Sequence, residues 1–164
     1  MRISSFLSIA MLAVVAALFV DVLPFSRHSA LAANFSSITG SWAGQGALKL
    51  GNGKTERLRC RAYYNPKKNG QQLGMAVRCA STSYKFEFRS KLSLNGTKVS
   101  GSWEEREFNA VGTIAGTFKE GKISLRASGG VDALLSVTYT STKQSVNLKG
   151  DFGDFKGISL SFRK

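Results

Sequence analysis

The chain has 164 residues, with one histidine, two cysteines and a formal net charge of +13 at pH 7. The histidine, His28, lies near the N-terminus, so the rest of the chain cannot build a histidine-based catalytic pair or most kinds of zinc site. The positive charge favours anionic partners. We therefore predict a protein that is not an enzyme and that holds no metal or cofactor.

Residues 1–32 have the pattern of a secretory signal. Arg2 is followed by an apolar run over residues 6–20, and Ala30-Leu31-Ala32 fits a cleavage site. The run is short for a membrane span, which needs about 20 residues. We predict a periplasmic or secreted protein whose mature chain starts near Ala33. The alternative is an uncleaved anchor in the inner membrane.

The remaining chain, 33–164, is long enough for one domain with its own core. Residues 1–32 hold two arginines and one aspartate, so the domain keeps +12 of the +13 charges. An exported protein rarely meets nucleic acid, and we expect no nucleic-acid partner. The oligomeric state is left open by the sequence.

From Ile38 onward the pattern indicates strands and turns without helices. The first strand spans 38–50 and ends at the turn Gly51-Asn52-Gly53. The next two strands form a hairpin over 55–81, folded at Asn69-Gly70 through a four-residue loop, 68–71. This fold places Cys60 opposite Cys79, within reach of a disulfide bond. The alternative is two free buried cysteines.

Apolar and polar residues alternate most clearly in a strand over 84–94. A type I′ turn at Asn95-Gly96 predicts that Leu92 faces Val99 and that Phe88 faces Trp103. Further strands follow at 110–118 and from Ile123. The remaining strands have these inward positions: Val131 to Tyr139, Val146 with Leu148, and Ile158 to Phe162. Two of the connections among these strands are predicted as loops over 128–130 and 151–156.

About ten short strands in simple succession predict an all-β fold. We interpret them as an antiparallel up-and-down meander closed into a small barrel, because closure removes exposed sheet edges. Glycines on the predicted inner face, including Gly44 and Gly116, allow the bending that a small barrel needs. A two-sheet β-sandwich is the alternative.

The triplet Gly40-Ser41-Trp42 recurs as Gly101-Ser102-Trp103. Here the chain resembles the calycin group of lipocalins, fatty-acid-binding proteins and avidin-like barrels, which begin with Gly-x-Trp on the first strand. The resemblance implies a barrel that binds a small ligand. It also implies an arginine packed over the tryptophan, for which Arg163 is the candidate, although Arg163 is out of phase with the inward Phe162. The chain also resembles small uncharacterised exported proteins of alphaproteobacteria, which implies a place in the cell envelope.

The first functional hypothesis is a barrel that binds a small apolar or amphipathic, lipid-like molecule. Its lining would be the inward aromatic residues and one carboxylate: Trp42, Tyr64, Phe86, Phe88, Trp103 and Glu105. The alternative is that the aromatic side chains only fill the barrel and that Glu105 reaches solvent near a strand end. Asp151 and Asp154 are a further, weaker possibility for a calcium site.

The second hypothesis is an envelope-associated structural protein. Its basic outer face would bind anionic lipid, lipopolysaccharide or acidic glycan. The residues that would bind are the outward cations of the disulfide hairpin: Arg57, Arg59, Arg61, Arg78, Lys67 and Lys68. The alternative is a solvated face that only keeps the protein soluble.

Overall fold

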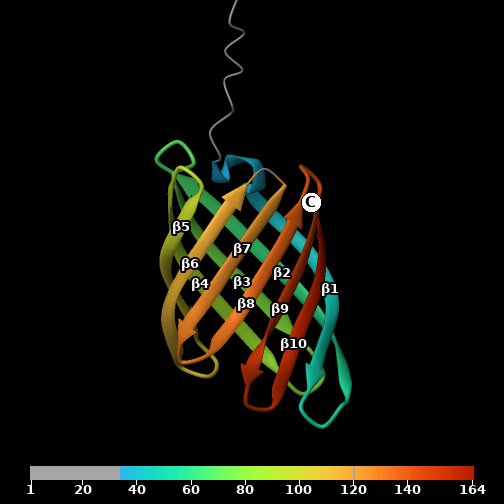
Figure 1. The fold of residues 1–164 in the computed structure, drawn as a ribbon. Helices are drawn as coiled ribbons and strands as arrows, with labels where there is room; N and C mark the ends of the chain where they lie inside the picture. Colours follow the sequence, from blue (N-terminus) through green and yellow to red (C-terminus); the bar gives the residue numbers. More distant parts are fainter. Residues whose placement is uncertain (1–33, 120) are drawn as a thin grey trace, which may run out of the picture. The chain divides into compact units, whose positions relative to one another are not determined.

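The computed structural model describes residues 34–119 and 121–164. The predicted signal segment, residues 1–32, lies outside the described residues. The chain forms a closed barrel of ten antiparallel strands, each paired with the next, and the last strand pairs with the first (Figure 1). The strands are β1 (Gly40–Leu50), β2 (Thr55–Lys67), β3 (Gln72–Ala80), β4 (Lys85–Asn95), β5 (Lys98–Glu105), β6 (Ala110–Lys119), β7 (Lys122–Gly129), β8 (Asp132–Tyr139), β9 (Lys143–Phe152) and β10 (Phe155–Arg163).

The barrel confirms the predicted all-β meander and rules out the two-sheet sandwich. The barrel forms because apolar and polar residues alternate with a period of two along the strands, so that one face of each strand is apolar. On β2, for example, Leu58 and Ala62 are fully buried inside, whereas Arg57 and Arg61 are exposed outside. The apolar inner faces of the ten strands together form one core. Among residues 34–119 and 121–164, no helix is long and apolar enough to cross a membrane.

The β2–β3 hairpin has the predicted register and loop. Cys60 lies directly opposite Cys79, and the two form a disulfide with an S–S distance of 2.02 Å. Lys67 pairs with Gln72, which leaves a four-residue loop between them. Asn69 and Gly70 both have positive φ, at 52° and 82°, as the Asn-Gly signal predicts. A disulfide of this kind is typical of proteins outside the reducing cytoplasm.

The first strand begins at Gly40 and not at Ile38, because residues Phe35–Ile38 form a short 3-10 helix, η1. The side chain of Asn34 accepts a hydrogen bond from the Ser36 N–H and caps this helix. η1 lies at the barrel end where the β2–β3 loop also lies (Figure 1). The Phe35 ring meets Phe118 edge-on at 5.0 Å, and the Phe35 N–H donates to the Gly70 carbonyl at 2.9 Å. η1 thus plugs this end of the barrel.

The predicted register between β4 and β5 is wrong. Leu94, and not Leu92, faces Val99, because Asn95 remains in the strand and the turn is centred on Gly96 and Thr97. Gly96 alone takes the positive φ that the turn needs, at 60°.

Because of this shift, Trp103 faces Ser90 and lies diagonal to Phe88. The two aromatic rings still stack, at 5.9 Å between centroids. Two loop boundaries also differ from prediction. β9 continues to Phe152 and β10 starts at Phe155, and β7 continues to Gly129. Hydrogen bonding across the sheet therefore extends into segments whose glycine and aspartate content indicated loops.

Candidate functional site

Three of the aromatic residues predicted to line a ligand site are packed into the wall of the barrel. Trp42, Tyr64 and Trp103 are all buried. The Trp42 Nε1–H donates to the Ile38 carbonyl at 3.0 Å, and the Trp103 Nε1–H donates to the Ser128 carbonyl at 3.3 Å. These contacts satisfy both indole groups within the protein and fix both rings.

Tyr64 belongs to a small polar group inside the barrel. Its hydroxyl donates to Gln144 Oε1 at 3.1 Å, and burial raises the pKa of Tyr64 well above its usual value. Gln144 and Ser90 are only 4% and 5% exposed. Gln144 Nε2 and Ser90 Oγ have no hydrogen-bond partner in the described part of the chain. These two residues are not among the site residues predicted from the sequence, although both interrupt an apolar inner face with a polar side chain.

Two facing walls of the barrel keep part of their inner surface accessible. The side chains concerned occupy inward positions, yet they are only partly buried, in contrast to Leu48 and Leu58, which are fully buried. One wall is formed by β3 and β4, and the other by β8, β9 and β10, on opposite sides of the barrel in Figure 1. The partly buried residues are Met75, Val77, Phe88, Leu135, Val137, Val146, Leu148 and Ile158.

Phe86 lies at the other end of the barrel, in an aromatic cluster with Tyr84, Phe108 and Phe155. The Phe86 ring is 5.5 Å from Phe155 and 5.8 Å from Phe108, and Tyr84 contacts Phe155 at 4.8 Å. Phe108 comes from the β5–β6 loop and is 51% exposed. This cluster covers the end opposite η1, so Phe86 and the predicted central aromatic residues do not form one site.

Glu105 is bonded to backbone at the same end. Its Oε1 accepts from the Glu87 N–H and its Oε2 accepts from the Phe108 N–H, both at 2.7 Å. The carboxylate therefore holds the β5–β6 loop in place. No group of three or more potential metal ligands occurs among the residues that the structure describes, and the side chain of Asp151 lies outside them.

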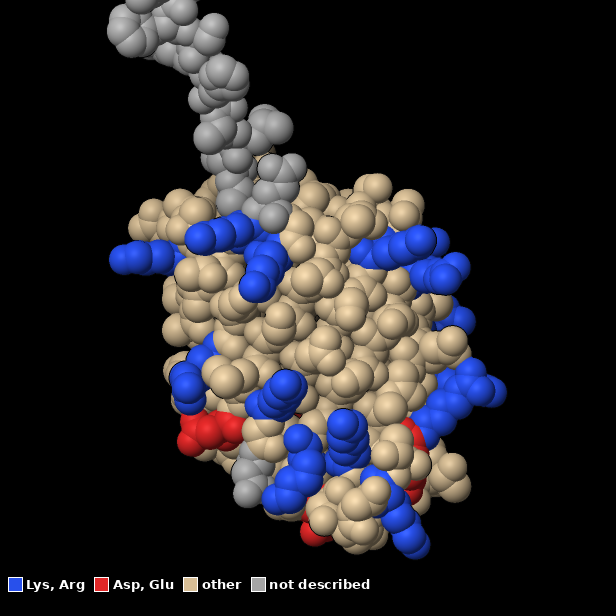
Figure 2. Space-filling model, turned by 45° about the vertical axis from the view of Figure 1, so that its right-hand side comes forward, with Lys and Arg blue, Asp and Glu red and all other residues tan. Residues whose placement is uncertain are grey.

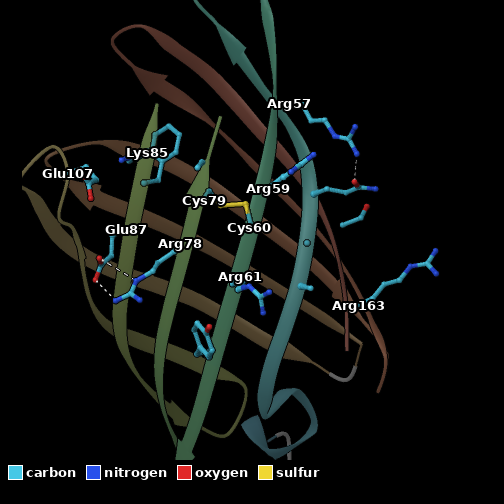
Figure 3. A pocket seen from close by; sticks show the side chains of 17 residues that line it. Arg57, Arg59, Cys60, Arg61, Arg78, Cys79, Lys85, Glu87, Glu107 and Arg163 are labelled. Carbon is cyan, nitrogen blue, oxygen red and sulfur yellow. Dashed lines mark hydrogen bonds and ion pairs between the residues drawn. A yellow bond between two sulfur atoms is a disulfide. The ribbon is translucent and has the colours of Figure 1, made fainter. Parts of the chain in front are cut away.

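A groove of about 1190 Å³ runs over the outer face of β10, β1, β2, β3 and β4 (Figure 3). Its walls carry six cationic side chains: Arg57, Arg59, Arg61, Arg78, Lys85 and Arg163. The groove exists because outward positions beside these long side chains are small, as at Ala43 and Ala80. The disulfide-bonded Cys60 and Cys79 lie at its floor, and Glu87 and Glu107 also line it.

The residues of the predicted basic surface lie in two separate places. Four of its members, all on β2 and β3, line the groove, but Lys67 and Lys68 do not. They lie at the β2–β3 loop, six residues or more from Arg61, which is about 20 Å along a strand. Figure 2 shows one face of the barrel, with Lys and Arg side chains near its upper and lower ends and along its right-hand edge. The six cations of the predicted basic surface therefore do not form one patch.

Three arginine side chains form ion pairs with the carboxylate of Glu87 beside the groove. Arg89 contacts it through two nitrogens, Arg106 Nη1 lies 3.3 Å from its Oε1, and Arg78 Nε lies 3.4 Å from its Oε2. The hydrogen bonds from Arg89, followed by those from Arg78 and Arg106, lower the pKa of Glu87 to about 2. Figure 3 shows Arg78 extended toward this carboxylate.

The other arginines of the groove differ in whether their side chains are paired within the protein. Arg57 donates to Gln45 Oε1 at 2.6 Å. Arg59, Arg61 and Arg163 form no ion pair or side-chain hydrogen bond in the part of the chain that is described. Among the arginines of the groove, these three are the ones most available to an external anion.

The cation over the first tryptophan is Lys164 and not Arg163. Lys164 Nζ lies 5.5 Å from the centroid of the Trp42 ring. Arg163 pairs with Ala43 and points outward into the groove. The expectation drawn from the calycin resemblance is therefore wrong at Arg163, because strand alternation directs the next residue, Lys164, to the inner side.

Comparison with known proteins supports the fold. No protein-family model and no curated protein sequence matches the chain. Rv2717c from M. tuberculosis matches with a TM-score of 0.60 and 12% identity, over 79% of this chain and 93% of that one. The S-type phycobiliprotein lyase CPES from Guillardia theta matches with a TM-score of 0.55 and 14% identity, over 79% and 90%. These likenesses, at 12% and 14% identity, show a shared barrel fold.

The second likeness corrects the prediction that the chain is not an enzyme. That prediction rested on the absence of any histidine beyond His28. The Guillardia theta protein is named a lyase and has the same fold at 14% identity. This barrel architecture is therefore compatible with catalysis, and the firm exclusion of an enzyme is contradicted.

Proposed function

We propose that this protein is an exported barrel that binds a small apolar or amphipathic molecule in its interior. The observation that carries the proposal is the partial exposure of inward apolar side chains on two facing walls, β3–β4 and β8–β10. A barrel of ten strands is wide enough to hold one small ligand. Apolar walls with a few polar groups are the usual lining of such a site. The disulfide is in keeping with export.

The lining proposed here differs from the sequence-based set. Phe88 and Val77 on one wall and Leu135 and Val146 on the other would contact the ligand directly. Trp42, Tyr64 and Trp103 would support those walls from behind or from the side. Phe86 and Glu105 would act at the barrel end, where they hold the aromatic cluster and the β5–β6 loop.

Fluorescence of the apolar dye Nile red tests the proposal. The full-length protein should bind one dye molecule per barrel, with a blue-shifted emission. Leu135→Trp adds bulk to the wall and should reduce binding at least tenfold, whereas Leu134→Trp on the exposed outer face of the same strand should not. Equal binding by both variants, or no binding by the unmodified protein, would contradict an interior site.

The outer groove favours a second function, the binding of an extended acidic glycan. Arg59, Arg61 and Arg163 are unpaired within the described chain and face a concave surface. Along β2, successive outward arginines are about 7 Å apart, so they form a line of charge. A concave groove accommodates a chain better than it fits a flat bilayer. Tyr63, which is partly exposed in the groove, offers a ring for a sugar to pack against.

Binding to heparin, a model acidic glycan, tests this second function. Replacing Arg57, Arg59 and Arg61 with serine should weaken binding at least tenfold and reduce its dependence on salt. The matched control replaces Lys98, Lys122 and Arg126, which are exposed cations on β5 and β7, and should change little. Equal losses in both variants would indicate a nonspecific charge effect. Preference for vesicles of phosphatidylglycerol over heparin would favour a membrane partner instead.

A further inference from the structure

The buried polar side chains inside the barrel, Gln144 and Ser90, each keep an atom that forms no hydrogen bond within the described chain. Gln144 Oε1 already accepts from Tyr64, but Gln144 Nε2 has no partner within the described chain. Ser90 Oγ is also without a partner there. Both side chains are at least nine-tenths buried and occupy inward positions. Buried polar groups are normally paired, so an unpaired donor here indicates a missing acceptor.

These groups lie close to the walls of the proposed ligand site. Gln144 is on β9 and pairs with Tyr139 and Phe162. Ser90 is on β4, between Met75 and Trp103 in the sheet register. Tyr64 shares that register row, because it pairs with Met75, and its hydroxyl reaches Gln144. The β3–β4 wall and the β8–β10 wall therefore contribute one unpaired polar atom each, and both atoms are themselves buried.

Within the ten described strands the inward positions contain no cation; Lys164, which follows β10, is exposed, with its Nζ 5.5 Å from the centroid of the Trp42 ring. Strand alternation places only two charged residues, Glu56 and Glu105, on the inner side. Both are near the end of the barrel that bears the aromatic cluster, and both accept hydrogen bonds from loop backbone. Glu56 Oε2 lies 3.2 Å from the Ser83 nitrogen, and hydrogen bonds from Ser81 and Ser83 lower the pKa of Glu56. An anionic ligand group between the β3–β4 and β8–β10 walls would thus be desolvated without a counter-charge from those walls, which is strongly unfavourable.

We propose that the interior ligand is uncharged and carries a hydrogen-bond acceptor, such as a carbonyl, that is bound by Gln144 Nε2 and Ser90 Oγ. This inference rests on the proposed function and narrows its ligand class. The acceptor satisfies a donor that is otherwise buried and unpaired. The apolar remainder of the ligand lies between the β3–β4 and β8–β10 walls. Free fatty acids, whose carboxylate is ionised at neutral pH, are poor ligands on this view.

Displacement of Nile red by three compounds that share a twelve-carbon chain tests the ligand class at pH 8. Methyl dodecanoate carries a neutral acceptor, dodecanoate is an anion and dodecane has no acceptor. With the full-length protein, methyl dodecanoate should displace the dye at a concentration about tenfold lower than either of the others, the effect of one good hydrogen bond. Equal or better displacement by dodecanoate would overturn the inference.

Variants of Gln144 and Ser90 then test where the acceptor of the ligand binds. Gln144→Leu should raise the half-displacing concentration of methyl dodecanoate about tenfold and leave that of dodecane unchanged. Ser145→Ala, on the outward side of the same strand, should change neither. Ser90→Ala gives a second test if Gln144→Leu does not fold. Unchanged ester binding in the folded variants would reject these contacts, whereas failure of Nile red to bind the unmodified protein would reject the interior site itself.

Discussion

At the scale of single residues, Glu87 is the clearest electrostatic centre of the protein. It is ionised against three arginines from β3, β4 and the β5–β6 loop, and its side chain is only 18% exposed. The carboxylate thus joins two strands and a loop. Because Arg78 is paired with this carboxylate, it is not one of the unpaired cations of the groove.

The low pKa of Glu87 predicts how stability depends on pH. Arg89, Arg78 and Arg106 lower it from 4.5 to about 2, so the folded state favours the ionised form. The stabilisation should be complete above about pH 5 and should disappear as the pH falls toward 2. We expect Glu87→Gln to melt at a lower temperature than the unmodified protein at pH 7, with the difference shrinking at pH 2.5.

Thermal melts at several pH values, followed by circular dichroism, measure this difference. Glu104→Gln is the control, because Glu104 forms no ion pair among the described residues. A melting-temperature difference that stays constant from pH 7 to pH 2.5 would show that Glu87 acts through shape and not through charge.

Single residues also show what the sequence could reveal about the site. Inward positions such as Trp42 and Trp103 followed from alternation, but their indole hydrogen bonds to Ile38 and Ser128 depend on the three-dimensional fold. Gln144 and Ser90 were missed because sequence alternation does not show whether a buried polar atom finds a partner. That depends on which strand lies across the barrel, as Tyr64 does for Gln144.

At the scale of elements, the β2–β3 hairpin is the only covalently closed unit in the described chain. The disulfide joins residues 19 positions apart in the sequence. Closing a loop of about 20 residues restricts the unfolded chain and should stabilise the fold by about 3 kcal/mol in the entropy model. It also fixes the floor of the outer groove.

Replacing both cysteines tests this contribution. We expect Cys60→Ala with Cys79→Ala to lower the free energy of unfolding by about 3 kcal/mol in urea titrations, without change in the far-ultraviolet spectrum of the native state. A loss much below 1 kcal/mol would mean that pairing of β2 with β1 and β3 alone fixes the hairpin.

The hairpins differ in how well the sequence predicted them. At Asn69-Gly70 the two cysteines restricted the possible registers, and the prediction was right. At Asn95-Gly96 the same dipeptide suggested a turn one residue too early, because only Gly96 needed positive φ. Both the predicted and the observed pairing place apolar residues inward, so the hydrophobic pattern could not choose between them.

At the scale of the whole molecule, closure of the barrel determines where a ligand could enter. One end is covered by η1 through Phe35 and Ile38, which are buried. The other end is covered by the aromatic cluster, in which Phe108 is half exposed. The sequence predicted neither cover, because each depends on short segments that meet the barrel only after it has closed.

Phe35 is the residue on which the η1 plug depends. It is fully buried, contacts Phe118 and is held by a backbone hydrogen bond to Gly70. Phe35→Ala should therefore lower the free energy of unfolding by about 3 to 5 kcal/mol, as for other buried phenylalanines. Opening this end should also speed the release of Nile red in stopped-flow measurements.

Ser37→Ala, an exposed change within η1, is the control. Faster release in Phe35→Ala at unchanged stability would identify η1 as a gate, whereas reduced stability with unchanged release would place ligand entry at the Phe108 end.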